Sequence, residues 1–169
     1  MPVTRQEFRD AMARLGAAVN VITTTGPAGK GGFTASAVCS VTDDPAMLLV
    51  CVNRTSNSGA MARENGILCV NALAAGQQEL AAVFAGATTC SMEDRFLTGS
   101  WGTLATGAPV LDDAVVSFDC RIADQVEKGT HIVLFAQIEA IRQGAPGGQA
   151  LIYFARDYHG VGVGVGEGQ

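Results

Sequence analysis

The sequence predicts a mainly β protein whose strands form a closed or partly closed barrel. Glycine accounts for 21 of the 169 residues, which indicates many turns and close backbone approaches. Strand-like runs rich in β-branched residues alternate with dense turn signals, and the strand–helix–strand repeat of a parallel sheet is absent. With 48% apolar residues, the chain can bury one substantial core.

The first element is predicted to be a short amphipathic helix. Thr4 and Glu7 have the spacing of a capping box, and Gly16 is a helix stop signal. Three apolar residues fall on one helical face: Phe8, Met12 and Leu15.

The next elements are predicted from turn signals and residue types. Residues 17–25 and the glycine-rich turn 26–32 indicate a β-hairpin. Further strands are expected at 33–41, 47–53, 67–73, 115–126, 131–142 and 150–154. Short helices are expected at 56–65 and 77–84, and the stretch 91–101 is interpreted as a loop with one helical turn. We expect one domain over residues 1–160 and a flexible glycine-valine tail over 161–169.

Composition argues against several classes of partner. The formal net charge of -5 and the absence of a long basic run argue against nucleic acid. No apolar segment approaches the ~20 residues of a membrane-spanning helix, and the first residues lack the pattern of a secretory signal, so we expect a cytoplasmic protein. The 5 cysteines are odd in number and widely spaced, which favours buried thiols over disulfides or a metal site.

Several catalytic motifs are absent. The glycines of the tail alternate strictly, so they do not form a dinucleotide fingerprint, and Gly29-Lys30 lacks the rest of a phosphate-binding loop. A nucleophile elbow is missing, and 2 histidines without suitably spaced carboxylates do not predict a metal centre.

One stretch carries most of the functional information. Residues 32–45, GFTASAVCSVTDDP, closely resemble the FMN-binding strand of flavin reductases. Further blocks that resemble this family follow in the same order: Cys51-Val52-Asn53 with Ser56, Leu68-Cys69-Val70-Asn71, Phe84-Ala85-Gly86, Gly129-Thr130-His131 and Arg156-Asp157-Tyr158-His159. The resemblance spans roughly residues 8–159. It is strongest to the flavin reductases of pyrimidine utilisation and to the reductase component of 4-hydroxyphenylacetate 3-monooxygenase.

The resemblance implies a split β-barrel with short flanking helices and FMN sites at the interface of a homodimer. It implies an NADH:FMN oxidoreductase that supplies reduced flavin to a separate monooxygenase, in pyrimidine or aromatic-compound catabolism. FMN is the expected flavin, with FAD as an alternative, and NADH is the expected reductant. No metal, nucleic acid or membrane partner is expected.

The cofactor-binding residues expected from this resemblance are Thr34, Ala35, Ser36, Ala37, Asn53 and Ser56. A flavin needs backbone and hydroxyl donors around its phosphate and along the polar edge of its ring. The small side chains of Ala35 and Ala37 would let the backbone approach the ring, while the Asn53 amide could bind ribityl or phosphate oxygens. The same residue types also occur on the polar face of an ordinary strand.

The resemblance assigns His131 to the catalytic site as a residue that seats the nicotinamide. Hydride passes directly from nicotinamide to flavin, so His131 is expected to position its substrate and not to transfer a proton. Arg156, Tyr158 and His159 are expected to close the same substrate pocket, although a strand-end cluster without function would look similar.

Two other functions fit the same sequence. The chain could use bound flavin to reduce another acceptor, such as a cobalt corrinoid. Alternatively, it could be a non-catalytic flavin-binding module, which would need the flavin strand but no nicotinamide pocket.

Overall fold

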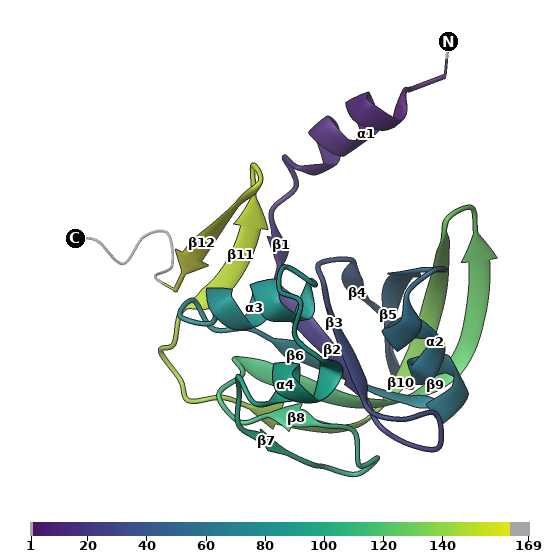
Figure 1. The fold of residues 1–169 in the computed structure, drawn as a ribbon, viewed down its shortest axis with the longest axis vertical. Helices are drawn as coiled ribbons and strands as arrows, with labels where there is room; N and C mark the ends of the chain where they lie inside the picture. The colour runs from purple at the N-terminus through teal and green to yellow at the C-terminus, as the bar shows by residue number, and fades with distance from the viewer. Residues whose placement is uncertain (1, 163–169) are drawn as a thin grey trace.

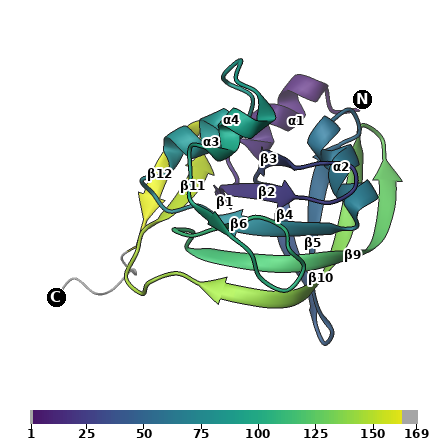
Figure 2. The same cartoon turned by 60° about the horizontal axis from the view of Figure 1, so that its bottom comes forward.

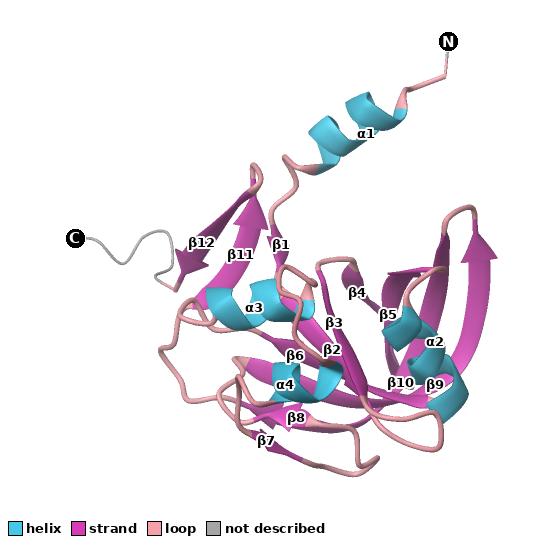
Figure 3. Cartoon of the chain, in the orientation of Figure 1, coloured by secondary structure: helices cyan, strands magenta, loops and turns pink. Residues whose placement is uncertain are grey.

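The computed structural model describes residues 2–162. The helices of this part are α1 (Arg5–Met12), α2 (Asn57–Asn65), α3 (Gln78–Phe84) and α4 (Met92–Phe96). Its strands are β1 (Ala17–Ala18), β2 (Asn20–Thr24), β3 (Gly31–Ala35), β4 (Val38–Asp43), β5 (Ala46–Asn53), β6 (Ile67–Ala72), β7 (Trp101–Gly102), β8 (Val110–Leu111), β9 (Val116–Lys128), β10 (His131–Gln143), β11 (Ala150–Phe154) and β12 (Asp157–Val161). Figure 1 shows this arrangement, and Figure 3 shows the short helices around the strands.

The main sheet has seven antiparallel strands in the order β3-β2-β6-β9-β10-β5-β4. Strands β3 and β4 therefore lie at opposite edges, although only Ser36 and Ala37 connect them. Because consecutive Cα atoms are ~3.8 Å apart, these edges can be no more than about 11 Å apart at this connection. The sheet must roll up, and the predicted barrel is confirmed as a split barrel.

The prediction of one continuous strand over 33–41 is wrong. The chain turns at Ser36, where the Val38 N–H donates to the Ser36 carbonyl at 2.9 Å. The Asn20 side chain, which is buried, donates to the carbonyl of Ala35 at 3.1 Å and fixes the end of β3. The small side chains of Ala35, Ser36 and Ala37 permit this turn but do not signal it in the sequence.

Helix α2 fills the gap between the two edges of the barrel. Its N-cap is Ser56, and it ends at Gly66, whose φ of 73° suits the left-handed conformation that glycine adopts readily. A Cβ at Gly31 of β3 would lie 3.0 Å from the Met61 sulfur, and a Cβ at Gly59 would lie 2.6 Å from Val52 of β5. Glycine at positions 31 and 59 therefore lets α2 pack closely against both edges.

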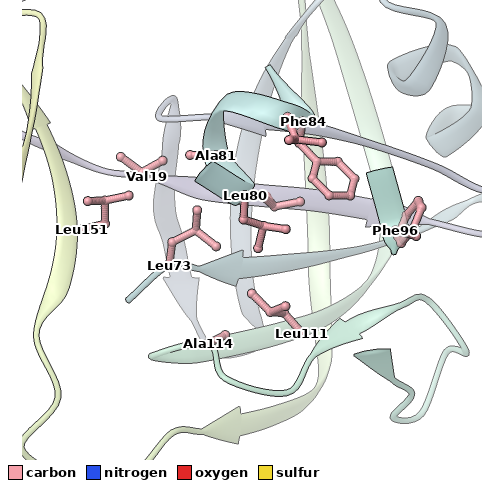
Figure 4. Packing of buried hydrophobic residues seen from close by; sticks show 11 residues of the cluster. Val19, Leu73, Leu80, Ala81, Phe84, Phe96, Leu111, Ala114 and Leu151 are labelled. Carbon is pink, nitrogen blue, oxygen red and sulfur yellow. The ribbon is translucent and has the colours of Figure 1, made fainter. Parts of the chain in front are cut away.

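Apolar side chains pack on both faces of the sheet. The barrel interior contains Ile22, Leu48, Val50, Val52, Leu68, Val70, Cys120, Ile132, Leu134 and Ala136. A second cluster lies between the outer face and helices α3 and α4, as Figure 4 shows, and includes Val19, Leu73, Leu80, Phe84 and Phe96. Strand β2 is buried along its whole length because it contributes side chains to both clusters.

Helix α1 lies away from the barrel and buries none of its residues (Figure 1). The expected Thr4–Glu7 capping box is present. The contacts that hold this segment to the body include the Asp10–Arg156 ion pair and a 2.7 Å hydrogen bond from the Ala155 N–H to the Ala13 carbonyl.

The C-terminal end differs from the expected boundary of the tail. Strand β12 pairs with β11 and extends to Val161, the first residue of the predicted tail. Residues 163–169, which make up most of that tail, lie outside the described residues. Among residues 2–162, no helix is long and apolar enough to cross a bilayer.

The side chain of Asn71 joins four strands at a fully buried position. Its amide donates to Val21 of β2 at 3.0 Å and to the Thr23 hydroxyl at 3.2 Å. Its oxygen accepts from the Leu111 N–H of β8 and from the Ser117 hydroxyl of β9, both at 2.9 Å. The polar groups that it satisfies would otherwise be buried without partners.

Replacing Asn71 with leucine should lower the free energy of unfolding by at least about 3 kcal/mol, because several buried groups lose their hydrogen-bond partners. Denaturant unfolding measures this change. The exposed Asn57, replaced in the same way, is the control and should change stability by about 0.5 kcal/mol or less. Equal effects at the two positions would contradict the structural role of Asn71.

Candidate functional site

The connection between β3 and β4 borders two adjoining pockets. The larger, about 1000 Å³, lies between α1 and the outer faces of β4 and β5. The smaller, about 210 Å³, is lined by Val19, Thr34, Ala35, Ser36, Tyr153 and Tyr158. Ser36 and Tyr153 line both pockets, so this connection lies where they meet.

The backbone of this connection offers hydrogen-bond donors. The N–H groups of Ser36 and Ala37 have no partner among the residues that the structure describes, and both residues are exposed. The Ala37 carbonyl accepts from Cys51 at 3.0 Å, which fixes the connection against β5. We define residues 34–37 as the cradle. It presents fixed main-chain donors to an open pocket, an arrangement that can bind a planar ring with acceptor atoms along one edge.

The hydroxyl of Thr34 is already used within the fold. It donates to the Ala81 carbonyl of α3 at 2.7 Å, so it holds α3 against β3. The sequence-based hypothesis treats this hydroxyl as a donor to flavin, but in this structure it can offer only an acceptor. Ser36 keeps an exposed side chain that makes no hydrogen bond within the described residues.

Asn53 and Ser56 follow at the end of β5, close to the cradle. Because Ala37 is bonded to Cys51, Asn53 lies only two residues farther along β5. The Asn53 oxygen accepts from the N–H and the hydroxyl of Thr55, so only its amide group faces outward unpaired within the described residues. The Ser56 oxygen accepts from Gly59 at 3.1 Å as the N-cap of α2.

His131 lies directly opposite Asn53 in the pairing of β10 with β5. It is exposed, and its Nδ1 is 2.8 Å from the Thr130 hydroxyl. The register thus brings His131 next to the predicted cofactor residues. Its place at the start of β10 agrees with the expected position after a turn.

The residues predicted at the C-terminal end lie on the other side of the cradle. Arg156 lines the larger pocket and is paired with Asp10, while Tyr158 lines the smaller pocket. The His159 Nε2 is 3.0 Å from the Phe154 carbonyl, and the residue lines neither pocket. In both views of the chain the hairpin β11–β12 lies far from the tip of β9–β10, so one chain does not bring His131 together with this group (Figures 1 and 2).

The electrostatics around the larger pocket have two clear causes. The hydrogen bond from Arg156 lowers the pKa of Asp10, and the same contact raises the pKa of Arg156. Burial is the larger cause of a raised pKa at the Cys51 thiol, and the nearby Cys39 raises that pKa further. The neutral thiol is therefore favoured at this position. Among the described residues no cluster of three or more potential metal ligands is present.

Sequence reasoning missed two residues at this site. Tyr153 lines both pockets and packs edge-on against Tyr158, with ring centroids 5.5 Å apart. Asn20 fixes the end of β3 from inside the fold. A polar residue within the apolar run 19–22 was the available signal for Asn20, whereas nothing in the local pattern distinguishes Tyr153 from a core aromatic residue.

Comparisons with known proteins give a consistent result. A family model described as flavin reductase like domain matches residues 12–162. A curated relative from Ancylobacter novellus, FMN reductase (NADH) RutF, is 55% identical over 94% of this chain and 86% of its own. The protein of the same name from Escherichia coli O139:H28 is 56% identical over 93% of this chain and 94% of its own.

Solved structures show the same likeness. A crystal structure described as a flavin reductase from Haemophilus somnus has a TM-score of 0.89 and 46% identity, covering 94% of this chain and all of its own. BorF, the flavin reductase component of a bacterial two-component tryptophan halogenase, has a TM-score of 0.86 and 25% identity, covering 95% of this chain and 99% of its own.

Proposed function

Because the chain belongs to the flavin reductase like domain family, we propose that it is an NADH:FMN oxidoreductase that supplies reduced flavin to a separate oxygenase. The single structural observation that supports this activity concerns the N–H groups of Ser36 and Ala37, which have no partner within residues 2–162 and belong to residues that line an open pocket. The likeness to the pyrimidine-utilisation reductases favours an oxygenase of pyrimidine catabolism over an aromatic hydroxylase.

The residues present fit an isoalloxazine ring. Small side chains at Ala35 and Ala37 let the ring approach the backbone, and the N–H groups of the cradle suit its acceptor-rich edge. The Asn53 amide group and the Ser36 hydroxyl would bind the ribityl chain. A bound flavin supplies the position that accepts hydride from NADH.

The residues of this chain would act by positioning. His131 would hold the carboxamide of the nicotinamide, which limits the rotation of that ring and lowers the entropic part of the barrier. Tyr158 and Arg156 would border the opposite side of the cradle. Because Ser36 and Ala37 are exposed, a flavin bound to the cradle would stay in contact with solvent, which suits a reaction whose reduced product must leave for another enzyme.

We also propose that the protein is a homodimer and that it works in the cytoplasm. An isolated helix of eight residues is marginal in water, yet α1 buries none of its residues and exposes 59% of Phe8 and 46% of Met12. Leu49 of β5 lines the larger pocket together with α1, and it pairs with Phe135 of β10; both side chains are half-buried. A second copy would cover both surfaces. The cysteines, which are all free, suit a reducing compartment.

The decisive test of the activity is NADH oxidation, followed by nicotinamide absorbance, with and without FMN. We expect rapid oxidation that depends on FMN, and hydroxylation of a pyrimidine substrate when the matching oxygenase is added. A protein that binds flavin without consuming either reduced nicotinamide would instead be a binding module. If the flavin-bound protein reduces a cobalt corrinoid but does not reduce free FMN, the chain is instead a reductase of that other acceptor.

Replacing His131 with alanine should raise the KM for NADH by about tenfold, the equivalent of one hydrogen bond, and leave the KM for FMN nearly unchanged. Steady-state kinetics with each substrate varied in turn measure the two effects. Lys128→Ala is the matched control, because Lys128 pairs with His131 across the hairpin. An equal rise in both KM values would remove His131 from the nicotinamide site.

A double variant, Phe8→Glu with Met12→Glu, should convert the homodimer to a monomer, because it places two charges in an apolar contact. Sedimentation velocity gives the mass in solution. Arg14→Glu, an exposed position next to α1, should leave the dimer intact. A wild-type protein that sediments as a monomer would refute the homodimer.

A further inference from the structure

Two free thiols line the larger pocket next to the cradle. Cys39 of β4 and Cys51 of β5 both border this pocket, as do Ser36 and Ala37. The sequence favours buried thiols, but Cys39 is exposed and Cys51 is half-buried. The remaining cysteines line neither pocket of the site. These two thiols are therefore the ones that a reaction in the pocket would meet.

The register of β4 with β5 places both thiols on the same face of the sheet. Val38 and Val50 are paired across the two strands, and both pack in the barrel interior. Because side chains alternate along a strand, the next residues, Cys39 and Cys51, point to the outer face. Cys39 and Cys51 are diagonal neighbours on that face, with Cα atoms ~7–8 Å apart and Cβ atoms closer.

A disulfide between these thiols requires a small movement of the backbone. Bridged cysteines have Cα atoms ~4.4–6.8 Å apart, slightly less than a diagonal pair provides. Strand β4 is an edge strand that pairs with β5 alone among the described residues (Figure 2), and this pairing shifts between Ser40 and Thr42. It can therefore move toward β5 without breaking its pairing with another strand. Ala37, two residues before Cys39, would move with it.

We propose that Cys39 and Cys51 form a reversible oxidation site that weakens the cradle when its reduced product is not used. The proposal rests on the proposed function, because that activity supplies the source of the oxidant. Reduced flavin that meets no oxygenase transfers two electrons to O2, which gives oxidised flavin and hydrogen peroxide. A flavin held in the cradle would release this peroxide into the pocket that both thiols line, even where a second copy covers α1.

The reaction has two balanced steps. The Cys39 thiolate attacks one oxygen of hydrogen peroxide, so an S–O bond forms, the O–O bond breaks and hydroxide leaves; the sulfur is oxidised to a sulfenic acid and the peroxide is reduced. The Cys51 thiol then attacks this sulfur. An S–S bond forms, the S–O bond breaks, and the sulfenic hydroxyl leaves as water with the Cys51 proton.

The exposure of the two thiols gives the order of these steps. Cys39 reacts first because it is exposed, whereas burial raises the pKa of the Cys51 thiol and keeps it neutral. The disulfide would then displace Ala37, whose N–H is one of the donors of the cradle. NADH oxidation would slow until a cellular dithiol reduces the bond. Transient, redox-sensing disulfides of this kind are the usual ones in a reducing compartment.

Peroxide treatment of the purified protein tests this site, with the KM for FMN measured before and after. We expect a rise of about tenfold that dithiothreitol reverses, and a pair of peptides linked through Cys39 and Cys51 in mass spectrometry. Cys39→Ser and Cys51→Ser should each abolish the rise. A rise that persists in both variants, or a treated wild type without the 39–51 link, would overturn the proposal.

The matched control is Cys90→Ser, because Cys90 is half-buried like Cys51 but lines neither pocket. It should show the same rise as the wild type. In a second experiment NADH, FMN and O2 replace the added peroxide, and catalase should prevent the rise. A rise that catalase does not prevent would exclude peroxide as the oxidant and overturn the proposal.

The two proposals fail in different ways. If the untreated wild type does not oxidise NADH in the presence of FMN, the proposed function fails. An active wild type whose peroxide treatment produces no link between Cys39 and Cys51 would refute the oxidation site alone.

Discussion

Ser36 and Ala37 join the two opposite edges of a seven-stranded sheet, and this short connection determines how the sheet must curve. The edges meet at the connection and separate farther along, where α2 packs between them. The same two residues line the larger pocket, and their N–H groups have no partner in the part of the chain that the structure describes. The short connection therefore determines both the closure of the barrel and the position of the candidate site. A longer connection would constrain neither of them as tightly.

The cradle is held in place by hydrogen bonds from three neighbouring elements. Asn20 fixes the Ala35 carbonyl, Thr34 holds α3 against β3, and Cys51 bonds to Ala37. These contacts leave the N–H groups of Ser36 and Ala37 without a partner among the described residues. The N–H groups at the turn are thereby oriented before any ligand arrives, which reduces the cost of ordering on binding. By contrast, α1 buries none of its residues against its own chain.

Local signals in the sequence predicted local features well. The capping box of α1 and the boundaries of α2 follow from short-range hydrogen bonding by Thr4, Glu7 and Ser56, so the sequence was sufficient. The turn at Ser36 was missed because alanine and serine fit strand and turn alike, and only the closure of the sheet decides between them. Strand β12 was missed because residues 156–159 were interpreted as a substrate-binding cluster and the alternating glycines that begin at Gly160 suggested a flexible tail. Likewise, sequence order could not show that His131 and Arg156 lie on different sides of the cradle.

The donors of the cradle belong to the main chain, and this has a consequence for how the site can change. Exchanging one side chain for another leaves an amide proton in place, so alanine scanning would pass over the groups most directly aimed at a ligand. Selectivity among related ligands would then evolve at the rim, through residues such as Tyr153, while recognition of the common ring persists. Side-chain substitutions at such a site would preserve binding of the same ring, and they would not by themselves produce binding of a different ring.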